Sequence, residues 1–158
     1  MKKGRMAPGF SLVEMLVAMS IAGILAAVAY PNFTEWRRWN ELHGASMLTT
    51  GEIHRARMQA IAQGRCVRLE VATSGGENYL CRVAATTSDC SSYASCSAEN
   101  RESIPGTVSI SGTLPTIDAS GLAVGGGSTI TVSNDHGTNT ISYNALARPT
   151  SDGIVATN

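Results

Sequence analysis

The chain has 158 residues, carries 12 basic and 12 acidic side chains, and is 43% hydrophobic. This length leaves room for one small folded domain beside a membrane segment and excludes two. The formal net charge of zero disfavours a protein that binds nucleic acid through overall positive charge.

The chain begins with a short basic leader that ends in glycine. Residues 1–9 contain three cations, Lys2, Lys3 and Arg5, and end in Gly9, which Phe10 follows directly. A secretory signal places its cleavage site after the apolar segment, next to small residues. Here the Gly9–Phe10 junction precedes the apolar segment, so this leader is not an ordinary signal peptide.

The next 21 residues, 10–30, have a single charged side chain, Glu14. A hydrocarbon core of ~30 Å requires about 20 helical residues, so this segment predicts a membrane-spanning helix. A carboxylate at the membrane centre costs up to ~3 kcal/mol and usually has a partner. A plain signal-anchor helix is the alternative interpretation, but it explains neither Gly9 nor Glu14.

This combination of features resembles the type IV pilin and pseudopilin class. The basic leader, Gly9, Phe10, Glu14 as the fifth mature residue, the apolar segment and Pro31 all fall where the family has them. The resemblance implies that a prepilin peptidase cleaves between Gly9 and Phe10 and methylates the new N-terminus. It also implies that Glu14 attracts the Phe10 amine of a neighbouring subunit during assembly.

The same resemblance implies a location and a set of partners. The chain would stand in the bacterial inner membrane in contact with lipid, with its head in the periplasm, and then enter a pilus or pseudopilus. Its partners would be the prepilin peptidase, an inner-membrane assembly platform and other pilin or pseudopilin subunits. Cleavage would leave 9 basic side chains against 12 acidic ones, because the leader holds three of the 12 cations.

After Pro31, residues 31–64 predict an amphipathic continuation of the same helix. Proline removes one backbone donor and bends a helix without necessarily ending it. We therefore expect one helix from Ser11 to Gln63, with Gly64 as its C-terminal stop. The sequence from Trp36 to Trp39 resembles an interfacial belt of aromatic and basic residues. The expected buried stripe consists of Leu42, Ala45, Thr49, Ile53, Ala56 and Ala60.

Residues 65–158 predict a globular β-rich head that contains all four cysteines. Disulfides are favoured over a zinc site, because the cysteines lack paired CxxC spacing and no histidine lies within five residues of them. The head is acidic: from Cys66 onward four arginines face eight Asp and Glu residues. The disulfide candidates are Cys66, Cys81, Cys90 and Cys96.

Alternation of apolar residues predicts a first hairpin, made by residues 66–71 and 78–84, with a turn centred on Gly75. In the expected register Cys81 points inward and Cys66 points to the other face, which disfavours a bond between them. Cys81 is then expected to pair with Cys90 or Cys96, and Cys66 with the remaining one. The expected opposing residues are Val71 with Tyr79, Leu69 with Cys81 and Val67 with Val83.

Further strands are expected in the rest of the head. Residues 86–103 are expected to form a polar surface loop, and short strands are expected around Val108 and Ile110 and around Leu122 and Val124. Residues 128–134 and 139–145 predict a hairpin in which Val132 opposes Ile141 and Ile130 opposes Tyr143. The predicted fold class is therefore α+β, with a long N-terminal helix packed against a small antiparallel sheet.

No residue pattern predicts catalysis. His43, His54 and His136 are isolated in sequence, and residues 135–139 lack the spacing of a calcium loop. We therefore expect a structural protein without a cofactor or a metal.

Within this class, residues 52–65, which lead into a strand at Cys66, and the terminal hairpin resemble GspH/FimT-type minor pilins and pseudopilins. This resemblance implies a minor pilin of a type IV pilus. A type II secretion pseudopilin is the alternative within the class, and a DNA-uptake receptor is the alternative outside it. DNA binding is disfavoured, because residues 144–149 hold only Arg148 where the receptors carry a basic Gly-Arg-x-Arg element.

Overall fold

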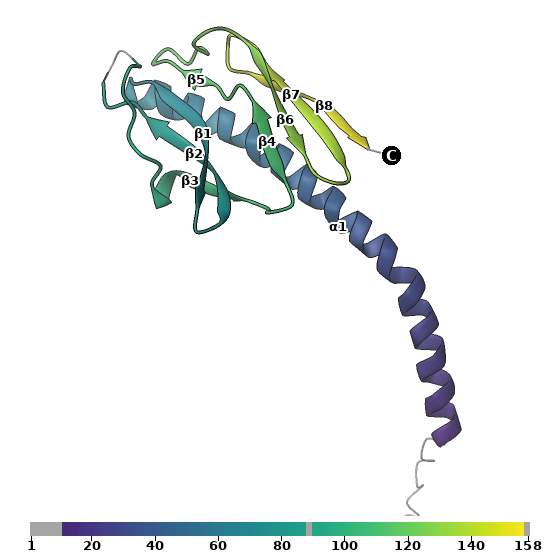
Figure 1. Ribbon diagram of the computed structural model, residues 1–158. Helices are drawn as coiled ribbons and strands as arrows, with labels where there is room; N and C mark the ends of the chain where they lie inside the picture. The colour runs from purple at the N-terminus through teal and green to yellow at the C-terminus, as the bar shows by residue number, and fades with distance from the viewer. Residues whose placement is uncertain (1–10, 88–89, 157–158) are drawn as a thin grey trace, which may run out of the picture. The chain divides into compact units, whose positions relative to one another are not determined.

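In a computed structural model, the described residues are 11–87 and 90–156 (Figure 1). Gly9 and Phe10, and with them the predicted cleavage junction, lie outside this part of the chain. The described residues divide into a unit that ends at Trp36 and a C-terminal unit that begins at Arg37. The elements after the helix are β1 (Val67–Ser74), β2 (Glu77–Ala84), η1 (Ala98–Asn100), β3 (Arg101–Ile104), β4 (Ser109–Gly112), β5 (Thr116–Ile117), β6 (Ser128–Ser133), β7 (Gly137–Tyr143) and β8 (Pro149–Ala156).

The helix α1 spans Leu12–Gln63 and contains Pro31 in its interior. The predicted continuous helix is therefore confirmed to within one residue at its start. Gly64 follows the last helical residue with a φ of 60°, a left-handed conformation that glycine adopts without steric cost. The predicted stop at Gly64 is confirmed.

The predicted buried stripe of α1 is also confirmed. Its six residues are at most 2% exposed, and five of them are completely buried. The stripe follows the three- and four-residue steps that place side chains on one face of a helix. Two polar residues on this face, Ser46 and Glu52, are buried as well. The apolar residues that meet this face in the core include Val67, Leu69, Leu80, Ile117, Ile130 and Ile141.

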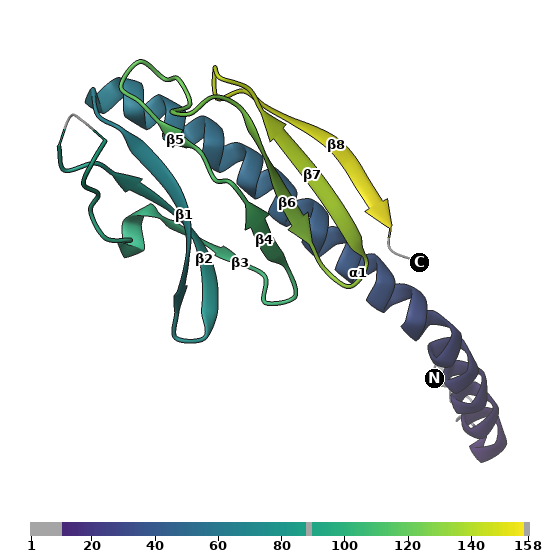
Figure 2. The same cartoon turned by 45° about the horizontal axis from the view of Figure 1, so that its top comes forward.

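Two four-stranded antiparallel sheets pack over the C-terminal part of α1 (Figures 1 and 2). Their strand orders are β3-β2-β1-β5 and β4-β6-β7-β8. The predicted α+β class, in which a long apolar helix packs against antiparallel β-structure, is confirmed, although one sheet was expected. In both views β8 is the outermost strand of its sheet.

The predicted register of the first hairpin is wrong by one residue. Ser74 pairs with Glu77, which leaves a two-residue turn of Gly75 and Gly76 instead of an odd loop centred on Gly75. Both glycines have positive φ, 63° and 84°, as the tight turns that suit the twist of a hairpin require. Leu69 therefore opposes Arg82, where Cys81 had been expected.

This shift reverses the faces of β2. Cys81 was expected to point toward the core, but it lies on the face of the sheet that points away from α1, as Cys66 does. Arg82 takes the face toward the helix, because its partner Leu69 belongs to the core there. Cys81 is completely buried all the same, because the segment after β2 covers the outer face.

The predicted register of the last hairpin is wrong by two residues. Ile130 pairs with Ile141, and Val132 pairs with Asn139. The turn is shorter than expected, because Asn134 closes it: its side-chain oxygen accepts from the N–H groups of His136 and Gly137. A shift of two residues keeps every side chain on its face, so the apolar residues still point to the core.

The strands of the remaining segments were less well predicted. The strand expected around Leu122 and Val124 is absent from the described residues, where this segment is a turn that joins the ladder only by a bridge from Ala123 to Ile117. The strand expected at Val108 and Ile110 is present as β4, which begins one residue later. The expected surface loop 86–103 is shorter than predicted, because its last three residues belong to β3. The strands β5 and β8 were not predicted.

Candidate functional site

The first part of α1 presents an apolar surface that no other described residue covers. Its large apolar side chains from Leu12 to Tyr30 are between 53% and 78% exposed. Each exposed apolar Å² costs roughly 25 cal/mol in water, so such a surface requires lipid or another protein. Among the described residues, α1 is the one helix long and apolar enough to cross a membrane.

Glu14 is exposed in the first turn of α1. A carboxylate in this place interacts favourably with the positive end of the helix dipole. Phe10, its expected partner in a neighbouring subunit, lies outside the described residues. Pro31 lies inside the helix, where its carbonyl oxygen accepts a hydrogen bond of 2.8 Å from the Thr34 hydroxyl. The rings of Phe33 and Trp36 have centroids 5.9 Å apart, which places an aromatic pair directly after the apolar segment.

At the start of the C-terminal unit, polar contacts fasten α1 to two loops. The Glu41 carboxylate accepts hydrogen bonds from Thr107 at 2.6 Å and from Arg37 at 2.9 Å. The Asn134 side chain donates to the carbonyl oxygen of Arg38 at 2.8 Å. The Thr107 hydrogen bond, followed by that of Arg37, lowers the pKa of Glu41 below its ordinary value. Glu41 is therefore more readily ionised in the folded chain.

A network of four charges joins the middle of α1 to the first sheet. The Glu52 side chain is 2% exposed and binds the guanidinium of Arg82, which is 14% exposed. Its other oxygen accepts from Arg55 at 2.8 Å, and Arg55 reaches Glu102 on β3 at 3.1 Å. Burial of a carboxylate without a cation would be costly, so this network fixes the register of the helix against β2.

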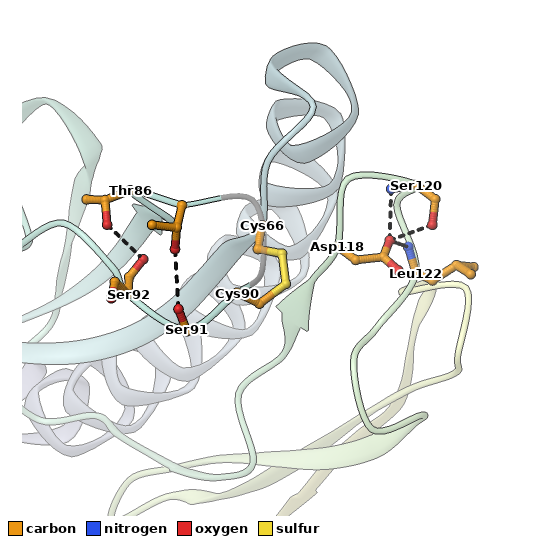
Figure 3. The surroundings of a disulfide bond; sticks show 9 residues. Cys66, Thr86, Cys90, Ser91, Ser92, Asp118, Ser120 and Leu122 are labelled. Carbon is orange, nitrogen blue, oxygen red and sulfur yellow. Dashed lines mark hydrogen bonds between the residues drawn. A yellow bond between two sulfur atoms is a disulfide. The ribbon is translucent and has the colours of Figure 1, made fainter.

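Two disulfides hold the segment that covers the outer face of the first sheet. Cys66 is bonded to Cys90 and Cys81 to Cys96, one of the two pairings that the sequence left open. Figure 3 shows the first of these bonds beside the loop of Asp118. The ring of Tyr93 from the same segment lies under the Arg68 guanidinium, 4.2 Å from its carbon to the ring centroid.

The Asp118 loop is closed by its own carboxylate. One side-chain oxygen of Asp118 accepts from the Ser120 hydroxyl at 2.6 Å and from the N–H groups of Ser120 and Leu122, each at 2.9 Å (Figure 3). These bonds, that of the Ser120 hydroxyl foremost, lower the pKa of Asp118. The carboxylate therefore has a structural role, and the described residues contain no cluster of three or more potential metal ligands.

An open groove of about 620 Å³ lies in the C-terminal unit between α1 and the strands β7 and β8. We call it the α1–β8 groove. On the other flank of α1, Met47 and Gly51 also line a smaller hollow of about 250 Å³ beside Glu102. Met47 and Gly51 therefore lie on a strip of α1 that has a hollow on each side. The residues that line the α1–β8 groove include Trp39, Met47, Gly51, His54, Asn139 and Ile154.

Two of the three histidines, which the sequence suggested to be isolated, share this groove. His43 and His54 both line it, because a spacing of eleven residues is three helical turns and returns to the same face. His43 stacks on Trp39, with ring centroids 5.1 Å apart and an interplanar angle of 6°. His136 lies in the turn before β7. The spacing of eleven residues between His43 and His54 was the sequence signal that could have indicated that they line one groove.

A comparison with protein families matches residues 5–30 to the prokaryotic N-terminal methylation motif. The match covers the end of the leader, the Gly9–Phe10 junction, Glu14 and the apolar segment. Comparisons with curated proteins and with solved structures give no significant match. The evidence for the family therefore rests on the N-terminal motif and on the fold.

Proposed function

Because the chain is a type IV pilin-like protein with an N-terminal methylation motif and a membrane-crossing helix, we propose that it is a minor pilin of a type IV pilus. It is a structural subunit and not an enzyme. The observation that carries the proposal is the order of its parts: the methylation motif, an exposed apolar helix, and a disulfide-bonded head packed on the end of that helix.

In this proposal, prepilin peptidase cleaves between Gly9 and Phe10 and methylates the Phe10 amine. Residues 1–9 are the leader, 10–30 span the membrane, 31–64 continue the helix and 65–158 form the head. The new amine is positive, and Glu14 of a neighbouring subunit is the anion that it would meet. A pair of opposite charges in an apolar surrounding is strongly attractive, so the Glu14 contact would fix the register of each added subunit.

The proposed location follows from the same parts. The subunit stands in the inner membrane with its head in the periplasm, and the assembly platform extracts it into the filament. Two disulfides agree with a periplasmic head, because disulfides form and persist in oxidising compartments. The exposed apolar side chains from Leu12 to Tyr30 support extraction, in which the helix would exchange contacts with lipid for contacts with other helices.

The minor role is supported by the resemblance of residues 52–65 to GspH/FimT-type subunits. These residues form the last three turns of α1 and its stop, where Ala56 and Ala60 pack in the core. Recovery of the chain from sheared surface filaments would support a pilus subunit. Retention in the periplasm together with a loss of protein secretion on deletion would instead assign it to a type II secretion pseudopilus.

DNA uptake is not part of the proposed function. The segment 144–149 is a turn in which the Asn144 side chain accepts from the N–H groups of Leu146 and Arg148. It presents one cation, Arg148, on an acidic head. A fragment that begins at Arg37 should therefore show no salt-sensitive binding to duplex DNA. Micromolar binding that weakens steeply with salt would overturn this conclusion.

The test of the proposed function uses full-length chains expressed in a piliated host. Gly9→Val should leave the leader attached and abolish incorporation into filaments. Glu14→Ala should be cleaved normally but incorporated poorly, because the carboxylate acts after processing. Gly106→Ala, a substitution in the head at which an added Cβ meets no atom within 4 Å, serves as the control. Normal incorporation of Gly9→Val would refute the proposal.

A further inference from the structure

We propose that two pairs of histidine and methionine on α1 bind a soft monovalent cation, Cu(I) or its analogue Ag(I). We call His43 with Met47 the groove site and His54 with Met58 the second site. The methylation motif ends at residue 30, and all four side chains lie beyond it in the C-terminal unit. The proposal concerns the single chain and does not depend on the proposed function, so the failure of one would leave the other intact.

The two sites are copies of one sequence pattern. Residues 42–47 and 53–58 both consist of an apolar residue, then His-x-Ala-x-Met, and the copies are offset by eleven residues. Eleven residues make close to three helical turns, so both copies lie on the same face of α1. After Pro31 the helix contains two histidines and two methionines, and all four belong to these pairs. Spacing of four between two histidines is absent from α1, but each histidine has a methionine at that spacing.

This spacing allows both side chains of a pair to reach one ion. Side chains four positions apart on a helix are neighbours, with Cβ atoms about 5–6 Å apart. A long helical side chain leans toward the N-terminus, over the residue four positions before it. Met47 therefore leans toward His43, and Met58 leans toward His54. The thioether sulfur and an imidazole nitrogen of each pair can meet at a cation between them.

In the structure, the two members of each pair line the same hollow. His43 and Met47 both line the α1–β8 groove. His54 and Met58 both line a hollow of about 310 Å³ on α1. Met47 is 64% exposed and Met58 is 69% exposed, whereas the apolar residue and the alanine of each copy are buried in the core. Core packing therefore explains the apolar residue and the alanine of the pattern, but it does not require methionine at the exposed position.

The ring of His43 is already oriented. It stacks on Trp39, with ring centroids 5.1 Å apart and an interplanar angle of 6°. Stacking occupies a face of the imidazole and leaves its two nitrogens at the edge, because they lie in the plane of the ring. A ligand that is held in one orientation loses less freedom when it binds. The stack therefore favours binding at the groove site.

The donors select a soft cation over a hard one. Thioether sulfur favours Cu(I), whereas Mg²⁺ and Ca²⁺ require oxygen ligands. Cu(I) and Ag(I) accept as few as two donors in line, so a pair is sufficient although the described residues contain no group of three His, Cys, Asp or Glu side chains that could hold a metal. The four cysteines are bonded in two disulfides, which leaves methionine as the soft donor.

The groove site should bind the cation more tightly than the second site. Among the described residues that line the α1–β8 groove, none is Asp, Glu, Lys or Arg. The hollow of the second site is also lined by Arg55 and Arg82. Both guanidinium groups are paired with Glu52, but they still add positive charge beside the cation.

The test titrates Ag(I) into the full-length chain in detergent micelles and in chloride-free buffer. The methionine methyl groups are labelled with carbon-13 and observed by NMR, and the signals of Met47 and Met58 are assigned through Met47→Leu and Met58→Leu. Ag(I) is the probe because air does not oxidise it, as it does Cu(I). Both signals should shift at micromolar Ag(I), that of Met47 first. Mg²⁺ at the same concentrations should shift neither.

Two variants distinguish a paired site from a lone thioether. His43→Gln should weaken Ag(I) binding at Met47 at least about tenfold and leave Met58 unchanged, because loss of a ligand costs no less than loss of a group that orients one. His54→Gln should weaken binding at Met58 and leave Met47 unchanged, so each variant is the control for the fold of the other. The same response of Met47 in the wild type and in His43→Gln would overturn the proposal. The absence of any shift at millimolar Ag(I) would overturn it as well.

Discussion

Loss of the Glu52 carboxylate should destabilise the C-terminal unit more than any exposed ion pair does. In Glu52→Gln the side chain keeps its volume but no longer neutralises Arg82, whose side chain is only 14% exposed. Removing one partner of a buried ion pair costs about 3–5 kcal/mol, because the other charge stays buried. Arg55, the second cation on Glu52, is 62% exposed and remains hydrated. We therefore expect a cost near the lower end, ~3 kcal/mol.

The assay is urea unfolding of a fragment that begins at Arg37, followed by circular dichroism. With a typical dependence of about 1–3 kcal/mol per molar urea, the midpoint should fall by roughly 1–3 M. Arg55→Gln is the matched control, because it removes an exposed partner of the same carboxylate and should cost at most ~1 kcal/mol. The double variant Glu52→Gln/Arg82→Met should lose less free energy of unfolding than the sum of the losses in the two single variants. The difference, which is the coupling free energy, should be about 1–3 kcal/mol. Equal costs for Glu52→Gln and Arg55→Gln, or strict additivity with Arg82→Met, would refute the role of the buried pair.

Three further predictions concern the same fragment. Replacing either pair of bonded cysteines by serine should lower the free energy of unfolding by about 3 kcal/mol, because the bonds join residues 24 and 15 positions apart; an unchanged urea midpoint would contradict this. Since the pKa of Glu41 is lowered from 4.5 in the folded state, its contribution to stability is present above pH 4.5 and is lost as the pH falls through the lower folded value. Thr107→Val should flatten this acid dependence, and an identical pH profile of the melting temperature would show that Thr107 has no such effect. Gly137→Ala should lower the free energy of unfolding by about 1–3 kcal/mol, because its Cβ would lie 2.4 Å from the Val155 carbonyl oxygen. Gly106→Ala is the control and should be neutral, because its Cβ would meet no atom within 4 Å. Equal melting temperatures for the two variants would argue against the close approach of β7 and β8.

The helix could be predicted from sequence because its signals are local and repeated. The stripe from Leu42 to Ala60 recurs every three or four residues, and Gly64 marks its end. The strand registers could not be predicted in the same way. In the first hairpin, a turn of two glycines and a turn of three residues both fit the alternation of apolar residues, and one residue of difference moves Cys81 from one face to the other.

The features that sequence reasoning missed depend on contacts between distant segments. Glu52 lies beside Ile53 in the buried stripe, but its partner Arg82 is 30 positions away and becomes visible only with the correct register. The strand β8 was missed because Pro149 and Gly153 weaken its pattern, and it is stabilised by pairing with β7. Residues of β8 form one wall of the α1–β8 groove. The groove could therefore not be predicted while β8 was missed.

As a processed pilin-like subunit, the chain should have Phe10 as its mature N-terminus. The most direct test is mass spectrometry of the intact chain from membranes and from sheared filaments, with sequencing of its N-terminal peptide. We predict a single mature form that begins with N-methylated Phe10 and retains the apolar segment to Tyr30. An N-terminus at Met1, or one located after Tyr30, would contradict the proposed processing and the assembly that depends on it.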